Sequence, residues 1–595
     1  MPLGTYYGYY DGFSIKKTVA FPVYMQGATI GFNFSDGDRA SLMNGISTAY
    51  YFAKKNGDKE FATILTNLMR STGYAVGDRR YDPDFKAEEV SEYPLDGYFR
   101  NVEAGSMRER WNDTGANYLG YRGGENNAGH QQLDKGHFVF DALGERWAED
   151  LGRDNYNYPG YFDYPQRYTY YVNRGEGHNV LLVNSKDRVD DQVHGVTVYK
   201  TGGESKAGGG YAVLDTTPVY YSEDVKSAKR GFMLTDFRKT AVIRDERVLN
   251  KNGCDIWWFM HTLADIEILE GGKEALLTQG NKQLMMRLDC TDPDARFEVT
   301  EPEHMSEKTK PEAQYITKLK NIKRLAINAK GNVGEFNLTV NMRGVQLSAQ
   351  EEFDFLNHFE PIAEWTVSDD VKKTDGLSDI RVNGETIQGF SKTNTVYDYN
   401  IERDDPIPEI SADALVGWRA DVIQADTLPG TAIIKVINEN NPADYYAVKV
   451  NIKVPLYIGL PENMLPLEIK NFEATPEGNG SDFAVNAFDN DFATRWAVEG
   501  NSQMLLDLGE SKEIDAVSVS FYLGDERINY YTIEVSDDKK EWKKVFDGES
   551  TGTSSDYMTV FLDNAKGRYV RLCFERTSTG TWNSTNEIKV MQKQK

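Results

Sequence analysis

Residues 129–152 read GHQQLDKGHFVFDALGERWAEDLG and are the most informative stretch of the chain. Residues 137–141 and 145–150 alternate in a way that predicts two strands, and Ala142-Leu143-Gly144-Glu145 between them predicts a hairpin turn. A turn centred near residues 142–143 places Asp150 opposite about residue 135. The segment that holds His130, Gln132 and Asp134 is therefore expected to approach Asp150 at one end of the hairpin.

A third segment is expected at the same edge. Residues 174–179 read RGEGHN and precede an apolar strand, which would bring His178 close to Asp150. Gln, Asp and His side chains that converge there provide the mixed nitrogen and oxygen ligands of a divalent ion. The alternative is that His130 and His178 are hydrogen-bonded loop residues and that Asp150 is a turn acid.

The regions around this stretch predict a mainly β protein with a helical start. Apolar residues lie three and four apart in 40–53 and 61–70, which predicts an αα-hairpin at the end of a larger helical array. From about Tyr118, short alternating runs with glycine-containing turns predict a large antiparallel sandwich. The predicted domains are 1–105 (helical), 106–370 (sandwich), 375–460 (Ig- or cadherin-like spacer) and 467–595 (all-β).

Composition narrows the class of protein. The chain has 595 residues, 40% of them apolar, and a formal net charge of −25. Such a chain can bury several cores, and its field disfavours nucleic acids and anionic membranes as partners. No apolar run is long enough for a transmembrane helix, and three scattered cysteines do not predict a disulfide framework. The first residues lack a signal peptide, so we expect either a cytoplasmic protein or a chain whose true N-terminus is missing; the motifs favour the second.

Three motifs together resemble a known family. Residues 129–152, NYNYPGYF at 155–162 and YYVNRGEGHN at 170–179 resemble the heparinase II/III-like polysaccharide lyases. The resemblance covers roughly residues 20–350. It implies an incomplete (α/α) toroid, here reduced to a C-terminal remnant, followed by an antiparallel β-sandwich. It also implies cleavage of uronic-acid polysaccharides by β-elimination.

The resemblance assigns roles to individual residues. His130 matches a histidine that takes part in proton transfer, and Asp150 and His178 match metal ligands. Gln132 stands where many members have a metal-binding histidine, which leaves Zn²⁺, Mn²⁺ and Ca²⁺ open. The family's acid/base tyrosine usually lies in the toroid, most of which is absent here. Some relatives use a tyrosine of the sandwich instead, so the candidates are Tyr156, Tyr161 and Tyr171.

Elimination explains these residue types. Removal of the C5 proton of a uronate builds a second negative charge beside a carboxylate, so a cation or strong donor has to neutralise it. A Tyr or His then serves as base and another as acid. Arginines around the motif can provide a basic lining, with Arg122 and Arg174 as the substrate-binding candidates among Arg108, Arg110, Arg122, Arg167 and Arg174. His137 and His261 are interpreted as structural.

The C-terminal segment resembles a second family. NAFDNDFATRW at 486–496, MLLDLG at 504–509 and NEI at 586–588 resemble discoidin-like (coagulation-factor type C) carbohydrate-binding modules. The resemblance implies a structural Ca²⁺ held by Asp489, Asp491, Thr494 and Glu587. The alternative is an ordinary Asx-rich turn. Trp582 and Tyr522 are candidates for stacking on sugars.

These observations predict a polysaccharide lyase of a bacterium, secreted, periplasmic or on the cell surface. Its partner would be an acidic polysaccharide, glycosaminoglycan-like or alginate-like, with a divalent metal in the sandwich and Ca²⁺ in the C-terminal module. The alternatives are a non-catalytic glycan-binding or adhesin-type protein that keeps the lyase sandwich as a scaffold, and a uronyl epimerase, which shares the first proton abstraction.

Overall fold

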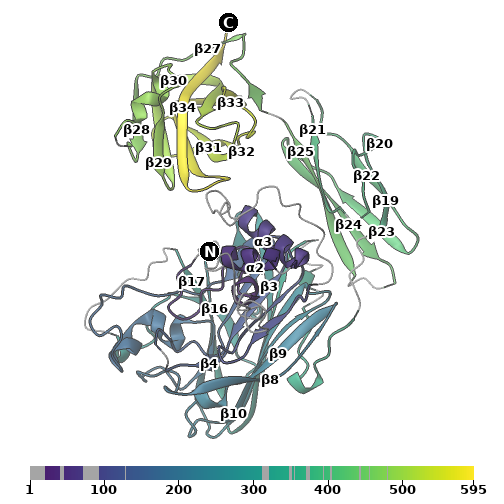
Figure 1. Ribbon diagram of the computed structural model, residues 1–595, viewed down its shortest axis with the longest axis vertical. Helices are drawn as coiled ribbons and strands as arrows, with labels where there is room; N and C mark the ends of the chain where they lie inside the picture. Colours follow the sequence, from purple (N-terminus) through teal and green to yellow (C-terminus); the bar gives the residue numbers. More distant parts are fainter. Residues whose placement is uncertain are drawn as a thin grey trace. The chain divides into compact units, whose positions relative to one another are not determined.

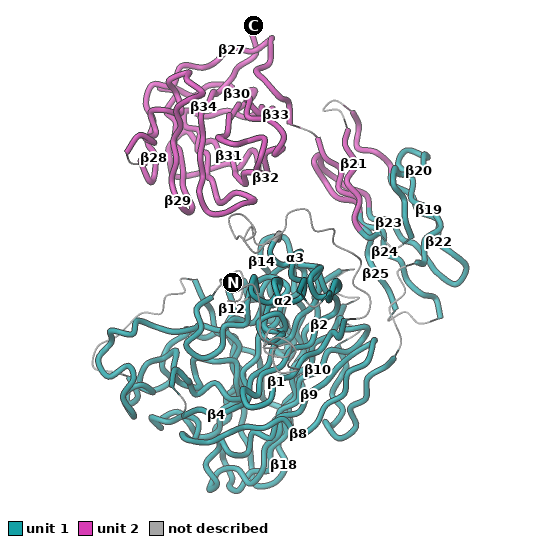
Figure 2. Tube along the Cα trace, in the orientation of Figure 1, with its two compact units in different colours: residues 1–395, 410–423, 433–448 teal, residues 396–409, 424–432, 449–595 magenta. Residues whose placement is uncertain are grey.

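The computed structural model describes residues 20–39, 46–55, 57–71, 93–127, 129–310, 321–346, 352–353, 356–369, 375–392, 394–401, 405–440, 444–454, 456–478 and 480–594. The chain divides into two compact units, coloured separately in Figure 2. The first comprises residues 1–395, 410–423 and 433–448, and the second comprises residues 396–409, 424–432 and 449–595.

A helical pair opens the first unit. Helix α2 (Ile46–Lys55) and helix α3 (Lys59–Ser71) confirm the predicted αα-hairpin; residues 40–45 of the predicted first helix lie outside the described residues. Asp58 caps α3, because its carboxylate accepts a hydrogen bond of 3.1 Å from the backbone N–H of Phe61. The buried face of the pair packs into one core with Phe32 and Trp111.

A small antiparallel sheet carries the 129–152 stretch. Its strands are β1 (Gly97–Phe99), β2 (Ala104–Arg108), β3 (Tyr118–Arg122), β5 (Phe138–Ala142) and β6 (Glu145–Ala148), in the order β1-β2-β3-β5-β6. Strands β5 and β6 form the predicted hairpin. Leu143 and Gly144 at its tip have φ angles of 56° and 81°, as a tight two-residue turn requires.

Two further antiparallel sheets form the sandwich of the first unit (Figure 1). The nine-stranded sheet has the order β13-β14-β15-β18-β11-β10-β9-β8-β4, and the four-stranded sheet has the order β16-β17-β12-β7. Their bounds are β4 (Gly124–Glu125), β7 (Leu181–Val183), β8 (Thr197–Lys206), β9 (Gly209–Asp215), β10 (Val225–Thr235), β11 (Thr240–Leu249), β12 (Cys254–Thr262), β13 (Asp265–Ile268), β14 (Glu274–Gln279), β15 (Lys282–Cys290), β16 (Arg296–Thr300), β17 (Lys323–Gly331) and β18 (Gly334–Gly344). The predicted mainly β, antiparallel fold is confirmed.

Residues 377–453 form two further sheets. The first has the order β20-β19-β22 and the second the order β21-β25-β24-β23. Their bounds are β19 (Leu377–Val382), β20 (Glu385–Thr386), β21 (Val396–Asn400), β22 (Ile410–Ala414), β23 (Trp418–Ile423), β24 (Gly430–Asn438) and β25 (Tyr445–Lys453). The division between the two compact units runs through this region, so the predicted domain limits stay predictions.

The C-terminal module is a β-sheet structure with its own core. Its main path is β27-β34-β30-β33-β31-β32, with β26, β28 and β29 paired at the side. Their bounds are β26 (Tyr457–Ile458), β27 (Met464–Pro466), β28 (Asn471–Thr475), β29 (Trp496–Glu499), β30 (Ser502–Phe521), β31 (Asn529–Ser536), β32 (Lys543–Glu549), β33 (Met558–Thr577) and β34 (Trp582–Lys593). Trp496 is fully buried at the centre of this core. Among the described residues no helix is long and apolar enough to cross a membrane.

Candidate functional site

The loop before β5 presents His130 at the protein surface. Two backbone hydrogen bonds fix this loop. The carbonyl of His130 accepts a hydrogen bond of 3.2 Å from the N–H of Asp36, and the N–H of Leu133 donates one of 3.0 Å to the carbonyl of Asn173. His130 itself has a φ of 65°, a left-handed conformation that non-glycine residues rarely adopt. Such strained residues cluster at functional sites.

His130 shares one ring nitrogen with two partners. Its Nδ1 lies 3.1 Å from Oδ2 of Asp36 and 3.2 Å from the hydroxyl of Tyr156, and its side chain is 59% exposed. Asp36 is fixed in turn by Arg167, whose Nη2 donates to Oδ1 at 2.7 Å. The sequence reasoning did not find Asp36, which lies 94 residues before His130 in the chain. We call His130 and Tyr156 the exposed pair.

Tyr156 is suited to donate a proton. Burial, followed by the charge of Asp36, raises the pKa of its hydroxyl, and the guanidinium of Arg153 opposes that shift. The Arg153 guanidinium lies 4.5 Å from the centre of the Tyr156 ring and forms an ion pair with Asp38 at 2.7 Å. A tyrosine whose pKa lies above its usual value is protonated at neutral pH, as a general acid has to be.

A second cluster from the same stretch is buried beside β5 and β6. Oδ2 of Asp150 lies 3.0 Å from Nε2 of His137 and 3.9 Å from Nδ1 of His178, and all three side chains are buried. Donor atoms of these residues lie within 4.8 Å of one another, close enough to surround one metal ion. Burial lowers the pKa of His178 to about 4, so its imidazole is neutral at neutral pH and is able to bind a metal.

The three predicted metal ligands carry buried polar atoms with few partners. Within the described residues, Oε1 of Gln132 and both ring nitrogens of His178 have no hydrogen-bond partner, and Oδ2 of Asp150 lies 3.0 Å from Nε2 of His137. The amide nitrogen of Gln132 donates to Gly152 at 3.3 Å, which places this side chain at the Asp150 turn. Buried polar atoms are normally satisfied, so this set of oxygen atoms, with the unprotonated ring nitrogen of His178, fits a divalent ion.

His137 differs in role from Gln132, Asp150 and His178. Its Nδ1 accepts a hydrogen bond of 2.9 Å from the backbone N–H of Asn179. The neutral ring then carries its proton on Nε2, the nitrogen that faces Asp150. His137 therefore orients a ligand, whereas Gln132, Asp150 and His178 are the residues with free lone pairs. We call these four residues the buried cluster.

Four other predicted site residues are buried and already bonded. The hydroxyl of Tyr161 contacts Asn173 (3.2 Å), and that of Tyr171 lies 2.8 Å from Nε2 of His261. Arg174 pairs with Glu176 at 2.7 Å, and Arg122 donates to Gln131 at 2.6 Å. All four side chains are buried, and Tyr156 is the candidate tyrosine that is partly exposed, so the roles of the four residues stay predictions.

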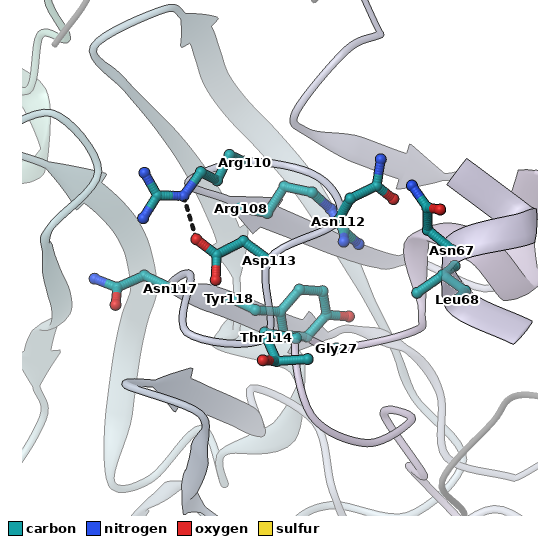
Figure 3. Close-up of a pocket in the computed structure, with 11 residues that line it drawn as sticks. Gly27, Asn67, Leu68, Arg108, Arg110, Asn112, Asp113, Thr114, Asn117 and Tyr118 are labelled. Atoms are coloured by element: carbon teal, nitrogen blue, oxygen red, sulfur yellow. Dashed lines mark hydrogen bonds and ion pairs between the residues drawn. The ribbon is translucent and has the colours of Figure 1, made fainter. Parts of the chain in front are cut away.

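A separate small hollow lies between α3 and the segment that runs from the end of β2 to the start of β3 (Figure 3). Asn67 and Leu68 of α3 face Arg108, Arg110 and the residues up to Tyr118 across it. Arg110 is paired with Asp113 at 2.5 Å. The hollow is lined by none of the residues predicted to be catalytic or metal-binding, so it is distinct from the exposed pair.

The C-terminal module also contains a buried carboxylate without a partner. Both carboxylate oxygens of Glu587 are buried among the described residues without a well-formed hydrogen bond, and burial, with the neighbouring Asp489 carboxylate, raises the pKa of this group. Nearby, Oδ2 of Asp489 accepts from the Thr494 hydroxyl at 2.7 Å, and Asp491 follows in the same turn. An orphaned carboxylate beside further oxygen donors fits Ca²⁺.

The aromatic candidates of this module are accessible. Trp582 is 50% exposed and Tyr522 is 37% exposed. The guanidinium of Arg495 lies 4.0 Å from the centre of the Tyr522 ring. An open aromatic ring beside a cation is a surface that suits an acidic sugar.

Comparison with known proteins identifies this module. Residues 486–572 match a coagulation-factor type C family model described as a NedA-like, galactose-binding domain. The C-terminal region is a discoidin-like module. The CBM32 module of AlyQ, solved with 4,5-unsaturated mannuronic acid, is 25% identical and covers 21% of this chain and 97% of its own, with a TM-score of 0.20. No curated protein matches the chain.

Other similar structures are lyases. The heparan sulfate lyase HepC from Pedobacter heparinus is 12% identical and covers 56% of this chain and 46% of its own, with a TM-score of 0.41. A heparinase III is 13% identical and covers 74% of this chain and 52% of its own, with a TM-score of 0.42. The chain spans about half the length of these lyases.

Proposed function

We propose that this protein is a polysaccharide lyase that cleaves a uronic-acid polymer by β-elimination at the exposed pair. The observation that carries the proposal is the contact of 3.2 Å between Nδ1 of His130 and the hydroxyl of Tyr156 at a partly open surface. Two groups that accept and donate protons are thereby held side by side, as an elimination requires.

The reaction follows from the environment of each group. Asp36 and Tyr156 engage Nδ1 of His130, so we assign Nε2 to the substrate. His130 removes the C5 proton of the uronate, the C4–O bond breaks, and a C4–C5 double bond forms. Tyr156 gives its proton to the departing oxygen. Arg153, which is partly exposed beside Tyr156, would pair with the uronate carboxylate as its negative charge grows.

The buried cluster would hold a divalent metal that has a structural role. Gln132, Asp150 and His178 supply its ligands, and Zn²⁺, Mn²⁺ and Ca²⁺ all accept such a donor set. The amide nitrogen of Gln132 donates to Oδ1 of Asp36 at 3.0 Å, and Asp36 holds His130. The cluster thereby fixes the carboxylate that orients the imidazole, while its burial keeps the polymer away from it.

The C-terminal module would retain the polymer. We assign a structural Ca²⁺ to Asp489, Asp491, Thr494 and Glu587 on the basis of the orphaned Glu587 carboxylate. Trp582 and Tyr522, with Arg495, would contact the acidic sugar. Because a polymer of this kind lies outside cells, we propose a secreted, periplasmic or surface-bound bacterial protein.

The proposal is tested with the full chain and a panel of uronic-acid polymers that includes alginate and heparan sulfate. A lyase produces an unsaturated uronate, which is followed by its ultraviolet absorbance. An epimerase would change the sugar configuration without that absorbance, and an adhesin would bind the polymer and change nothing. Absence of unsaturated product from every polymer, with the protein folded and supplied with divalent metal, would refute the lyase assignment.

A further inference from the structure

An exposed phenylalanine lies directly beside the exposed pair. The Phe162 side chain is 52% exposed, and its ring centre lies 5.3 Å from that of His130 and 5.0 Å from that of Tyr156. The Phe162 ring also lies 5.3 Å from that of Tyr161 and 5.7 Å from the guanidinium of Arg167. Exposed aromatic rings that adjoin one another, rather than a single exposed ring, mark a binding surface.

A second open ring follows on the same loop. Tyr164 is 60% exposed, and its ring is stacked on that of His194 with centres 4.4 Å apart and planes inclined by 17°. Its hydroxyl donates to Asp190 at 2.9 Å. His194 therefore covers one face of the Tyr164 ring, and the exposed part of the ring is left for another partner.

The loop that carries both rings is firmly held. The backbone N–H of Asp163 donates to Gly160 at 2.9 Å, and the N–H of Arg167 donates to Asp163 at 2.7 Å. The guanidinium of Arg167 also donates to the carbonyls of Gln131 (2.9 Å) and Tyr161 (3.1 Å). The same arginine binds Asp36, so the two rings and the exposed pair share one support.

We propose that Phe162 and Tyr164 form an aromatic platform on which sugar rings of the substrate polymer stack next to the exposed pair. This inference rests on the proposed function, because the polymer bound at His130 has to continue over neighbouring residues. One face of a pyranose ring presents C–H groups, and the electron-rich face of an aromatic ring attracts them. Rigid rings contribute contact area at a low cost in conformational entropy.

Removal of either ring of the platform should weaken binding of the polymer and leave the rate of the chemical step almost unchanged. Phe162→Ala and Tyr164→Ala should each raise KM for polymer about tenfold, which corresponds to one stacked ring, and leave kcat within about twofold. The rise in KM should be smaller for the shortest oligosaccharide that is cleaved. Tyr164→Phe keeps the ring and loses the bond to Asp190, so it should behave as the wild type. Thermal unfolding of each variant checks that the fold is intact.

A local probe separates stacking from indirect effects. Phe162→Trp keeps an aromatic ring and adds a fluorophore at the platform. Titration of this variant with alginate or heparan sulfate oligosaccharides should change its emission beyond the change seen in the wild type. The His130→Asn/Phe162→Trp double variant allows the same titration without turnover.

The outcomes distinguish the two proposals. In the Phe162→Trp single variant, an emission change without unsaturated product keeps the platform and refutes the lyase assignment. Cleavage with unchanged KM in both alanine variants, or an equal loss in Tyr164→Phe and Tyr164→Ala, overturns the platform and leaves the lyase assignment intact. No emission change with any oligosaccharide also overturns the platform.

Discussion

The exposed pair and the buried cluster differ in their access to water and in the hydrogen bonds that their histidines make. The His130 side chain is 59% exposed and its Nδ1 is shared by Asp36 and Tyr156, whereas His178 is fully buried and both its nitrogens lack a partner within the described residues. An exposed imidazole with a shared nitrogen is arranged to move a proton. A buried imidazole with free lone pairs is arranged to hold an ion.

The two sites are also connected in one direction. Gln132 belongs to the buried cluster through its Oε1 and holds Asp36 through its Nε2, and Asp36 holds His130. Damage to the buried cluster should therefore reach the exposed pair, whereas damage to the exposed pair should leave the buried cluster intact. The following predictions test this asymmetry.

The largest effect is expected from Asp150→Ala. This change removes the charged ligand and leaves the remaining polar atoms of the cluster buried without it. We expect a loss of about 3–5 kcal/mol in the free energy of unfolding, measured by denaturant titration, together with loss of bound metal and of activity. Treatment of the wild type with a strong chelator should likewise lower its stability and its activity.

Asp38→Asn is the matched control, because Asp38 is an exposed aspartate of the same surface that pairs with Arg153. It should keep its metal content and its stability within about 0.5 kcal/mol. An Asp150→Ala protein as stable as the wild type, with unchanged metal content, would contradict the assignment of the buried cluster.

The second effect concerns the exposed pair. His130→Asn removes the imidazole and keeps a residue that tolerates the left-handed backbone at this position. We expect kcat to fall by about 10²–10⁴-fold while thermal unfolding and metal content stay at wild-type values. Metal loss in this variant would show that the two sites are not separable, and unchanged activity would remove His130 from the mechanism.

Local patterns were sufficient to predict much of the fold. The Leu143-Gly144 turn and the alternation on both sides of it predicted the hairpin, and the apolar spacing of residues 61–70 predicted α3. These features depend on neighbours within a few residues. The hairpin and the loop after it also led to the expectation that His178 approaches Asp150, and the structure places Nδ1 of His178 3.9 Å from Oδ2 of Asp150. Metal binding by Gln132, Asp150 and His178 stays a prediction.

Long-range packing accounts for what could not be predicted. Asp36 approaches His130 across 94 residues, and no periodicity in the sequence marks it. Tyr156, Tyr161 and Tyr171 were equivalent candidates, because only packing shows that Tyr156 is open and that the other two are buried. The role of His137 depends on the hydrogen bond from Asn179, which a strand pattern does not show.

A smaller effect is expected at the residue that orients the ligand. His137→Gln removes the ring N–H that faces Asp150 and leaves the three ligands in place. Metal affinity, measured by competition with a chelator, should fall about 10–100-fold, with full activity restored at high metal concentration. A variant that loses metal as completely as Asp150→Ala would mean that His137 is itself a ligand.

The smallest shift in pH dependence is expected at Arg153, beside the fall in kcat that loss of its contact with the uronate carboxylate would cause. Its positive charge lowers the pKa of Tyr156 against the raising effects of burial and Asp36, so Arg153→Gln should raise that pKa further. If Tyr156 acts as the acid, its protonated form then persists to higher pH. The pH at which kcat falls on the alkaline side should rise by less than about one unit, because Arg153 and Tyr156 are partly open to solvent and their interaction is screened. Arg153→Lys keeps the charge and should leave that pH unchanged. A downward shift in Arg153→Gln would contradict the assignment of Tyr156 as the acid, and it would leave the buried cluster untouched.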